Sequence, residues 1–445
     1  MRNKKYWGKH TKKAKENFPF EEFKFPKEFI KNLALIKAAS AKANLNLKLI
    51  ERKKAEAIFK TAIEVSKGKY QEQFPLSIFQ TGSGTSTNIN MNEVISNIIK
   101  EKYKIDIHPN DDVNKCQSSN DVIPTTIYLT TISKTKNLLI PILKKLEKFF
   151  LKKGKEFYEI VTVGRTHLQD ALPISLGEEF FGYSKIISTH RKNIENSSKN
   201  LHFLPLGGTA VGTGLNAHKD FAKKTIANLS KLTNLKLKEG KNHFELQSSI
   251  GNITIFSNSI KNLSLELFKI TQDLKLKNYF GEISIPPLQE GSSIMPGKVN
   301  PVTLEVIQQI CFDIIGKDLS ISLSSFSSNF ELNTFLPLVF YNLYTSIELL
   351  SKGIDIFIEK TLKSLSANAD ICRRYAENSP AIITPLSLKI GYDKSAELVK
   401  IANDEKKSVL EIIKERNALP EKEIEEIFNL KKMAFSFNLK KNKRI

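Results

Sequence analysis

The chain has 445 residues, of which 40% are hydrophobic and 26% charged, a composition typical of globular proteins and not of disordered chains. Its formal net charge is +21, from 68 Lys and Arg against 47 Asp and Glu. The lysines are spread along the whole chain without an RNA-recognition, zinc-finger or basic-zipper pattern, which favours a lysine-rich composition over a specific nucleic-acid partner.

Cysteine use and hydropathy bear on the compartment. The three cysteines, Cys116, Cys311 and Cys372, are odd in number and far apart, so they form neither a disulfide framework nor a metal-ligand cluster. The longest apolar runs are far shorter than a membrane span, and the basic segment 1–16 has no apolar signal-peptide core. We therefore expect a cytoplasmic protein that spans no membrane and needs no metal or other cofactor.

The first part of the chain, residues 1–117, mixes short helical stretches with loops. Residues 41–67 are predicted to form one amphipathic helix, because apolar side chains recur at helical spacing. Proline and glycine break the pattern in residues 74–92, and the next helix is expected over residues 92–102.

Long amphipathic helices dominate residues 121–362. Apolar residues recur there every three or four positions, which is typical of helix faces buried in a bundle. Two irregular polar stretches, 164–173 and 206–216, interrupt the helices. A smaller charged segment begins near residue 367 and ends in a basic tail, 440–444, which we expect to be solvated. The pattern predicts a mainly α fold.

A hydroxyl-rich turn lies at residues 81–87, where Ser83, Gly84 and Thr85 are followed by several asparagines. Hydroxyls and backbone N–H groups on a glycine-bearing turn can bind a carboxylate. The GxxxxGK[ST] pattern of a phosphate loop is absent. A capped turn before the next helix explains these residues equally well, so both interpretations stay open.

A second polar run extends from His108 to Asp121. Ser118, Ser119 and Asn120 at its end can hydrogen-bond a small polyanion, or they can cap the helix that follows. The two roles are compatible, because the N-terminus of a helix attracts anions.

His167 is one of only seven histidines and lies in the polar stretch 164–173. It can carry a proton near neutral pH if a carboxylate orients it, and Glu305 is a candidate for that carboxylate. Each residue also has a simpler explanation: a structural histidine, and a first-turn glutamate favoured by the helix dipole.

The most distinctive stretch is GSSIMPGKVNP, residues 291–301. Its glycines, serines and prolines exclude a helix or a central strand and predict a loop. The loop carries the hydroxyls of Ser292 and Ser293, the ammonium of Lys298 and the carboxamide of Asn300. Such a loop can close over a site and bring backbone N–H groups close to an anion, which Lys298 would hold by charge.

Six strings of the chain resemble the class II fumarases of the aspartase/fumarase superfamily: TGSGTSTNINMNEVISN, HPNDDVNKCQSSND, GRTHLQDALPISLGEEF, LGGTAVGTGLN, GEISIPPLQEGSSIMPGKVNP and NFELN. The resemblance runs almost from end to end. Aspartases generally have glutamine at the position of His167 and alanine at that of Gly208. Argininosuccinate and adenylosuccinate lyases usually have PQKxNP in place of PGKVNP.

This resemblance implies a three-domain fold with a central five-helix bundle, and a homotetramer whose bundles form a twenty-helix core. We place the domains at residues 1–117, 118–366 and 367–445. It also implies metal-independent interconversion of fumarate and L-malate, at active sites that each draw on three subunits.

The roles that the resemblance implies follow the matching positions. Ser292 would remove the proton from C3 of malate, with Lys298 lowering the pKa of its hydroxyl. His167, oriented by Glu305, would handle the water or hydroxyl at C2. The carboxylate-binding set would comprise Ser83, Gly84, Thr85, Ser118, Ser119, Asn120, Thr166, Ser293, Lys298, Val299 and Asn300. A second dicarboxylate site would comprise His108, Pro109, Asn110 and Asp111.

Two positions depart from the family pattern. Ile105 stands where an arginine usually precedes the second site, and Gly251 stands where an aspartate is common. The alternatives to a fumarase are an aspartase-like ammonia-lyase and a catalytically dead homologue that serves as a structural or nucleic-acid-binding protein. The presence of Ser292, His167 and Lys298 argues against the dead homologue.

Overall fold

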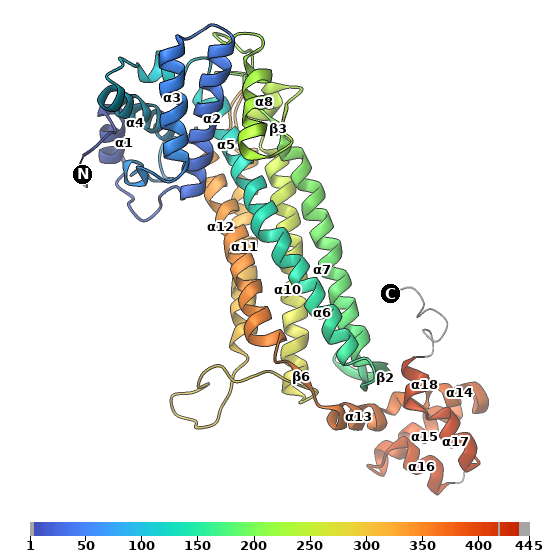
Figure 1. Cartoon of the computed structure of the whole chain (residues 1–445). Coiled ribbons are helices and arrows are strands. Elements are labelled where there is room, and N and C mark those ends of the chain that lie inside the picture. Colours follow the sequence, from blue (N-terminus) through green and yellow to red (C-terminus); the bar gives the residue numbers. More distant parts are fainter. Residues whose placement is uncertain (1–3, 417–418, 436–445) are drawn as a thin grey trace. The chain divides into compact units, whose positions relative to one another are not determined.

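The computed structural model describes residues 4–416 and 419–435, so the predicted basic tail lies outside the described residues. The fold is mainly α-helical, as predicted (Figure 1). It divides into two compact units: Met1–Pro141, His190–Leu265 and Ile310–Ser351 form the first, and Ile142–Thr189, Glu266–Gln309 and Lys352–Ile445 the second. The division into three domains stays a prediction.

Short and medium helices make up much of the first unit. Their bounds are α1 Lys9–Asn17, α2 Lys27–Asn46, α3 Arg52–Ser66, η1 Gln71–Gln73, α4 Thr85–Tyr103, η2 Pro109–Val113, α5 Ser119–Lys134, η3 Thr135–Leu139, η4 Lys199–His202, α8 Phe221–Thr233 and α9 His243–Ser248. Two short strands, β3 Phe203–Leu204 and β4 Lys238–Glu239, pair in parallel. Helices α2 and α3 pack side by side (Figure 1).

Five long helices contribute residues to both units. They are α6 Ile140–Glu156, α7 Leu176–Ser198, α10 Gly251–Tyr279, α11 Val302–Phe326 and α12 Leu336–Phe357. In the first unit, polar contacts join neighbouring helices within an otherwise apolar core. Ser257 of α10 donates to Asp318 of α11 at 2.7 Å, and Asn342 of α12 donates to Ser320 of α11 at 2.9 Å. These contacts fix the helices side by side, as expected of a bundle.

The second unit combines the other parts of these helices with a hairpin and a small helical cluster. Its further elements are β1 Val161–Thr166, β2 Gln169–Ser175, β5 Ile283–Ser284, η5 Ile358–Leu362, β6 Ser366–Ala367, α13 Ala369–Asn378, η6 Pro380–Ile383, α14 Thr384–Ile390, α15 Tyr392–Asp404, α16 Val409–Glu415, α17 Glu421–Ile427 and α18 Leu430–Ala434. Strands β1 and β2 are antiparallel, as are β5 and β6. The C-terminal helices share their own apolar core around Leu386 and Ile412.

Three local predictions were wrong. Residues 41–67 form two helices, because the chain turns after Asn46 with Lys48 in the left-handed region (φ +57°). No glycine or proline marks this turn in the sequence, so helical spacing alone could not reveal it. Helix α4 begins at Thr85 and not near residue 92, because its asparagines are buried by tertiary packing. The stretch 164–173 forms most of a β-hairpin.

The described helices include none that is long and apolar enough to cross a membrane.

Candidate functional site

The hydroxyl-rich turn meets the N-terminus of helix α4 in the first unit. The hydroxyl of Ser83 lies 3.0 Å from that of Thr81 and 2.7 Å from that of Thr85, so the three form a hydrogen-bonded chain. Gly84, at the N-cap of α4, has φ +72°. A side chain there would be strained and would also meet Ile123 of α5 at 3.0 Å. Gly84 therefore allows the starts of α4 and α5 to lie close together.

Ser118 caps helix α5, which confirms the structural half of the prediction for this segment. Its hydroxyl accepts from the backbone N–H of Asn120 at 3.2 Å, and the carboxylate of Asp121 accepts from the N–H of Ser118 at 3.0 Å, forming a capping box. Asn88 of α4 donates to the hydroxyl of Ser119 at 3.3 Å. The first unit thus brings two predicted groups, around Ser83 and Ser118, to neighbouring helix N-termini, where partial positive charge favours an anion.

Two buried charged side chains that sequence analysis missed lie beside these N-termini. The side chains of Lys37 (α2) and Asp121 are both fully buried. Burial lowers the pKa of Lys37 to about 7 and raises that of Asp121 to about 6, although backbone N–H donors and the charge of Lys37 partly oppose the second shift. The aspartate was detectable as the fourth residue of a capping box. In the sequence, Lys37 differed from its neighbours only as a charged residue on an otherwise apolar helix face.

His167 lies at the tip of the hairpin formed by β1 and β2 in the second unit. His167 and Leu168 are the two turn residues, with φ of +55° and +60°, which is the signature of a type I′ turn. Such turns favour glycine and asparagine, so a histidine and a leucine at these two positions indicate local backbone strain. The side chains of His167 and its neighbour Thr166 are exposed.

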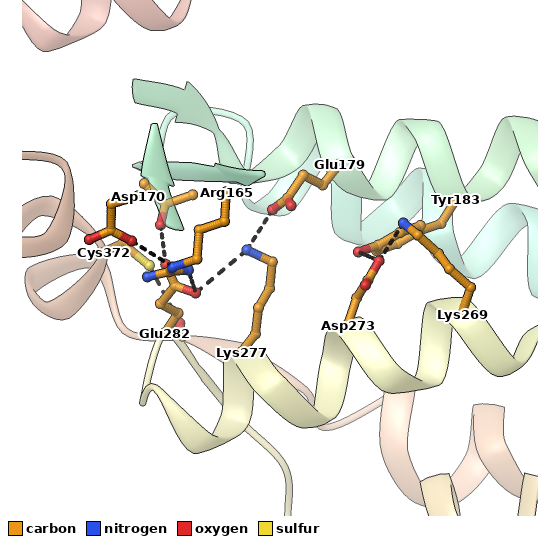
Figure 2. Close-up of polar contacts among 10 residues, drawn as sticks. Arg165, Asp170, Glu179, Tyr183, Lys269, Asp273, Lys277, Glu282 and Cys372 are labelled. Atoms are coloured by element: carbon orange, nitrogen blue, oxygen red, sulfur yellow. Dashed lines mark hydrogen bonds and ion pairs between the residues drawn. The ribbon is translucent and has the colours of Figure 1, made fainter. Parts of the chain in front are cut away.

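A buried network around Glu282 holds the base of this hairpin (Figure 2). Its carboxylate accepts from Thr162 at 2.6 Å and from the guanidinium of Arg165 at 2.9 Å, and it lies 3.6 Å from the ammonium of Lys277. Lys277 also pairs with Glu179 at 2.7 Å, and burial raises the pKa of Glu179. Sequence analysis missed the network, because Thr162 and Arg165 lie 120 and 117 residues from Glu282 along the chain.

Arg165 connects this network to the strand pair that carries His167. Its Nε donates to Asp170, its register partner across the hairpin, at 2.8 Å. The guanidinium also lies over the rings of Phe280 and Tyr375, at 4.5 and 5.0 Å from their centroids. Burial opposes the charged form of Arg165, but the carboxylates of Glu282 and Asp170 outweigh it and raise the pKa of Arg165, so the guanidinium remains a fixed cation.

The loop at residues 291–301 is ordered by its own hydrogen bonds. Gly291 donates to the carbonyl of Lys298 at 2.8 Å, and Asn300 donates to the carbonyl of Gly291 at 2.9 Å. A Cβ at Gly291 would lie 2.5 Å from that lysine carbonyl, so only glycine fits. The hydroxyl of Ser292 accepts from the backbone N–H groups of Ile294 and Met295 at 3.2 and 3.1 Å.

The remaining side chains of this loop face outward. Ser293, Lys298 and Val299 are exposed, and Glu305 is half-buried in the first turn of α11. Within the described part of this unit, no hydrogen bond or ion pair joins His167 to Glu305 or to Ser292. The orienting role of Glu305 therefore stays a prediction.

The residues predicted to form a second dicarboxylate site are clustered in the first unit. Nδ1 of His108 accepts from the backbone N–H of Asp111 at 3.1 Å, and Pro109 to Asp111 form the first turn of η2. His108, Asn110 and Asp111 are exposed, whereas Pro109 and Ile105 are half-buried. Ile105 supplies no charge, so an anion here would rely on these groups and the exposed Lys104 nearby.

Comparison with known proteins places these motifs in a family. Residues 1–316 match the family described as Lyase, and residues 382–434 match Fumarase C C-terminus. The class II fumarate hydratase of Wigglesworthia glossinidia brevipalpis is 41% identical over 94% of this chain and 93% of its own length. The chain belongs to the class II fumarate hydratase family. The Bacillus subtilis fumarate hydratase class II is 38% identical, over 95% and 94% of the two chains.

Solved structures extend the fumarate hydratase likeness to the fold. Class II fumarase from Schistosoma mansoni superposes with a TM-score of 0.95 at 33% identity, covering 98% of this chain and 97% of that one. The fumarate lyase:delta crystallin from Brucella melitensis bound to cobalt gives a TM-score of 0.93 at 35% identity, with the same coverage. Among the described residues of this chain, no three His, Cys, Asp or Glu side chains gather as a metal-holding group.

Proposed function

We propose that this protein interconverts fumarate and L-malate. The observation that carries the proposal is the ordered loop at residues 291–301, which presents a serine hydroxyl and a lysine in a chain of the class II fumarate hydratase family. The reaction needs a base at C3 of malate, a group that exchanges a proton at C2, and donors that hold two carboxylates. The chain has candidates for each.

Ser292 is the proposed base at C3. The proton at this carbon is weakly acidic, and the anion formed is stabilised by delocalisation into the adjacent carboxylate. A serine can act as a base only if its alkoxide is stabilised, and the hydroxyl of Ser292 already accepts from two backbone N–H groups. The exposed ammonium of Lys298 in the same loop would add charge stabilisation for the substrate carboxylate as negative charge develops.

His167 is the proposed proton carrier at C2. Imidazole can accept a proton near neutral pH, and the hairpin presents this side chain at an exposed tip. The network around Glu282 holds the hairpin from below, so the tip can keep one position without a stabilising glycine. In this proposal Glu305 comes from elsewhere in the assembly to orient the imidazole.

The N-termini of α4 and α5 are the proposed binding site for a substrate carboxylate. Ser83, Thr85, Ser118 and Asn120 provide hydroxyl, amide and backbone donors at two adjacent positive helix ends. In the proposed assembly, Thr166, Ser293 and Asn300 of other subunits would complete the set that holds both carboxylates of a four-carbon diacid. His108 and its neighbours form a separate proposed dicarboxylate site, weakened by Ile105.

We also propose a homotetramer with shared active sites. Helix α11 exposes large apolar side chains at Phe312, Leu319, Leu323 and Phe326, whose spacing of seven, four and three residues places them on one helix face. An apolar face of this kind favours burial against further copies of the chain. Sharing between subunits would also explain why His167 and Glu305 do not meet within one chain.

An ultraviolet assay of fumarate formation tests the function. Purified protein is supplied with malate and, separately, with aspartate, because both substrates yield absorbing fumarate. We expect turnover of malate only, and Ser292→Ala should abolish it while gel filtration still shows the tetramer. Ser364→Ala, which removes an exposed serine of the same unit, should match wild type. Faster conversion of aspartate than of malate would refute the assignment.

A further inference from the structure

The loop at residues 206–216 has an unusual backbone, and none of its residues is among the predicted site residues. Positive φ occurs at five of its eleven residues: Gly207, Thr209, Gly212, Gly214 and Asn216. Two of these five are not glycine, so the conformation carries local strain. The amides of Gly212 and Gly214 both donate to the carbonyl of Gly208, at 2.9 and 3.0 Å. A strained loop with few internal bonds must be held in place by its neighbours.

Asp121 supplies the principal restraint. One oxygen of its buried carboxylate accepts from the backbone N–H groups of Gly207 and Thr209, both at 3.0 Å, and the other accepts from Ser118 at 3.0 Å. One side chain therefore fastens the loop to the N-terminus of α5. Asn120 adds a second tie, because its amide donates to the carbonyl of Ala210 at 2.8 Å.

The other face of this N-terminus is supported by Lys37. Its ammonium donates to Asn114 at 2.9 Å and to Gln117 at 3.1 Å, and Asn114 also accepts from Asn88 at 3.1 Å. The positive charge of Lys37 favours the ionised form of Asp121, which is the form that can accept three hydrogen bonds. The two buried charges thus organise both sides of the segment that contains Ser118, Ser119 and Asn120.

Unsatisfied polar atoms mark the same region. The hydroxyl of Thr209 and one amide oxygen each of Asn88 and Gln247 are buried without a hydrogen-bond partner among the described residues. Gln247 nevertheless donates to the carbonyl of Thr209 at 2.8 Å. Unsatisfied buried groups cost stability and tend to persist where function requires them.

We propose that the loop at residues 206–216 forms a wall of the dicarboxylate site, and that Asp121 is the positioning residue that sets its distance from Ser118, Ser119 and Asn120. This inference rests on the proposed function. Ala210 is exposed, and its carbonyl accepts a hydrogen bond from Asn120, which is one of the predicted carboxylate-binding residues. The exposed side of the loop near Ala210 would therefore face the bound dianion.

The first test is Asp121→Asn, which keeps the shape of the side chain but loses acceptor capacity. We expect the KM for malate to rise about tenfold to a hundredfold, while kcat changes by less than about threefold, because a misplaced binding wall weakens ground and transition states alike. A purely structural role would lower the active fraction, and hence kcat, without changing KM. Glu411→Gln is the matched control, since it exchanges one oxygen of the capping-box carboxylate of α16 for an amide nitrogen, and α16 carries no proposed site residue.

The second test uses charge and does not depend on Asp121. Ala210→Asp places a carboxylate on the exposed side of the loop, and Ala210→Asn is its neutral counterpart. We expect the KM for malate to rise roughly tenfold or more in the charged variant and by less than about threefold in the neutral one, because like charges repel across a short distance. Added salt should narrow this difference.

Wild type measured in parallel distinguishes a failure of the proposed function from a failure of the proposed role of the loop. If wild type does not convert malate, the proposed function fails, and the loop is then tested by the thermal shift that succinate induces in the two Ala210 variants. Equal KM values, or equal succinate shifts, in Ala210→Asp and Ala210→Asn would overturn the inference. An Asp121→Asn enzyme with the KM of wild type would overturn it as well.

Discussion

Replacing Glu282 by glutamine should destabilise the protein far more than its single lost charge would on the surface. The side chain is fully buried. Its carboxylate accepts hydrogen bonds from Thr162 and Arg165 and forms an ion pair with Lys277. Glutamine fills the same space, but its amide nitrogen cannot accept a hydrogen bond. One of the three partners, itself a donor, then faces the N–H donors of the amide. The cations Arg165 and Lys277 also lose the negative charge that neutralised them.

The magnitude follows from burial. The side chains of Arg165 and Lys277 are only 13% and 8% exposed, so water and salt screen them little. Breaking a buried ion pair by removing one partner costs about 3–5 kcal/mol. Each kcal/mol shifts the Tm of a domain of about 150–250 residues by about 2–4 °C, so the Tm should fall by about 6–20 °C. The hairpin that bears His167 should loosen, and kcat should fall with it.

Differential scanning fluorimetry of Glu282→Gln and of Glu423→Gln tests this reasoning. Glu423 pairs with Lys389 at 2.7 Å in the same unit, but the two side chains are 43% and 52% exposed. Exposed pairs contribute about 0–1 kcal/mol, so the control should change Tm by no more than about 4 °C. If Glu282→Gln melts within the range of the control, the carboxylate does not hold the hairpin as argued.

Three further predictions concern single side chains. His167→Gln should lower malate–fumarate turnover by roughly two to four orders of magnitude, the range for loss of a general base, with a smaller change in succinate inhibition; steady-state kinetics near wild type would exclude the role. Lys298→Met should lower kcat and raise KM together, because the charge serves ground and transition states, and an unchanged kinetic profile would contradict this. Lys37→Met should alter the pH dependence of stability. Because burial lowers the pKa of Lys37 to about 7, the unfolded chain binds one more proton than the folded chain between that pH and the ordinary lysine pKa of 10.5. Wild type should therefore gain stability relative to the variant as pH rises through this window. Urea unfolding of both proteins at pH 7 and near pH 10 measures the difference, and parallel curves would refute it.

Local chemistry explains why part of the site was predictable. The Ser118 cap and the loop at residues 291–301 depend on residues a few positions apart, so their sequence patterns carry the structure directly. The motif LGGTAVGTGLN was also recognised in the sequence, but the physical reason for a glycine at position 208 was not. A Cβ there would lie 2.0 Å from Gln247 and 2.8 Å from the Cβ of His243, a contact that appears only after folding.

Sequence by itself determined that this chain is mainly α-helical, that it resembles the class II fumarases, and which short polar strings carry the candidate chemistry. Only the tertiary structure decided that α2 and α3 are separate, that His167 lies in a strained hairpin turn, and that Glu282 and Asp121 hold the segments around the site. Arg165 and Glu282 are 117 residues apart, and Asp121 and Gly207 are 86. Helical periodicity and capping report interactions within a few residues, whereas burial of a charge depends on partners that the chain brings together only when it folds.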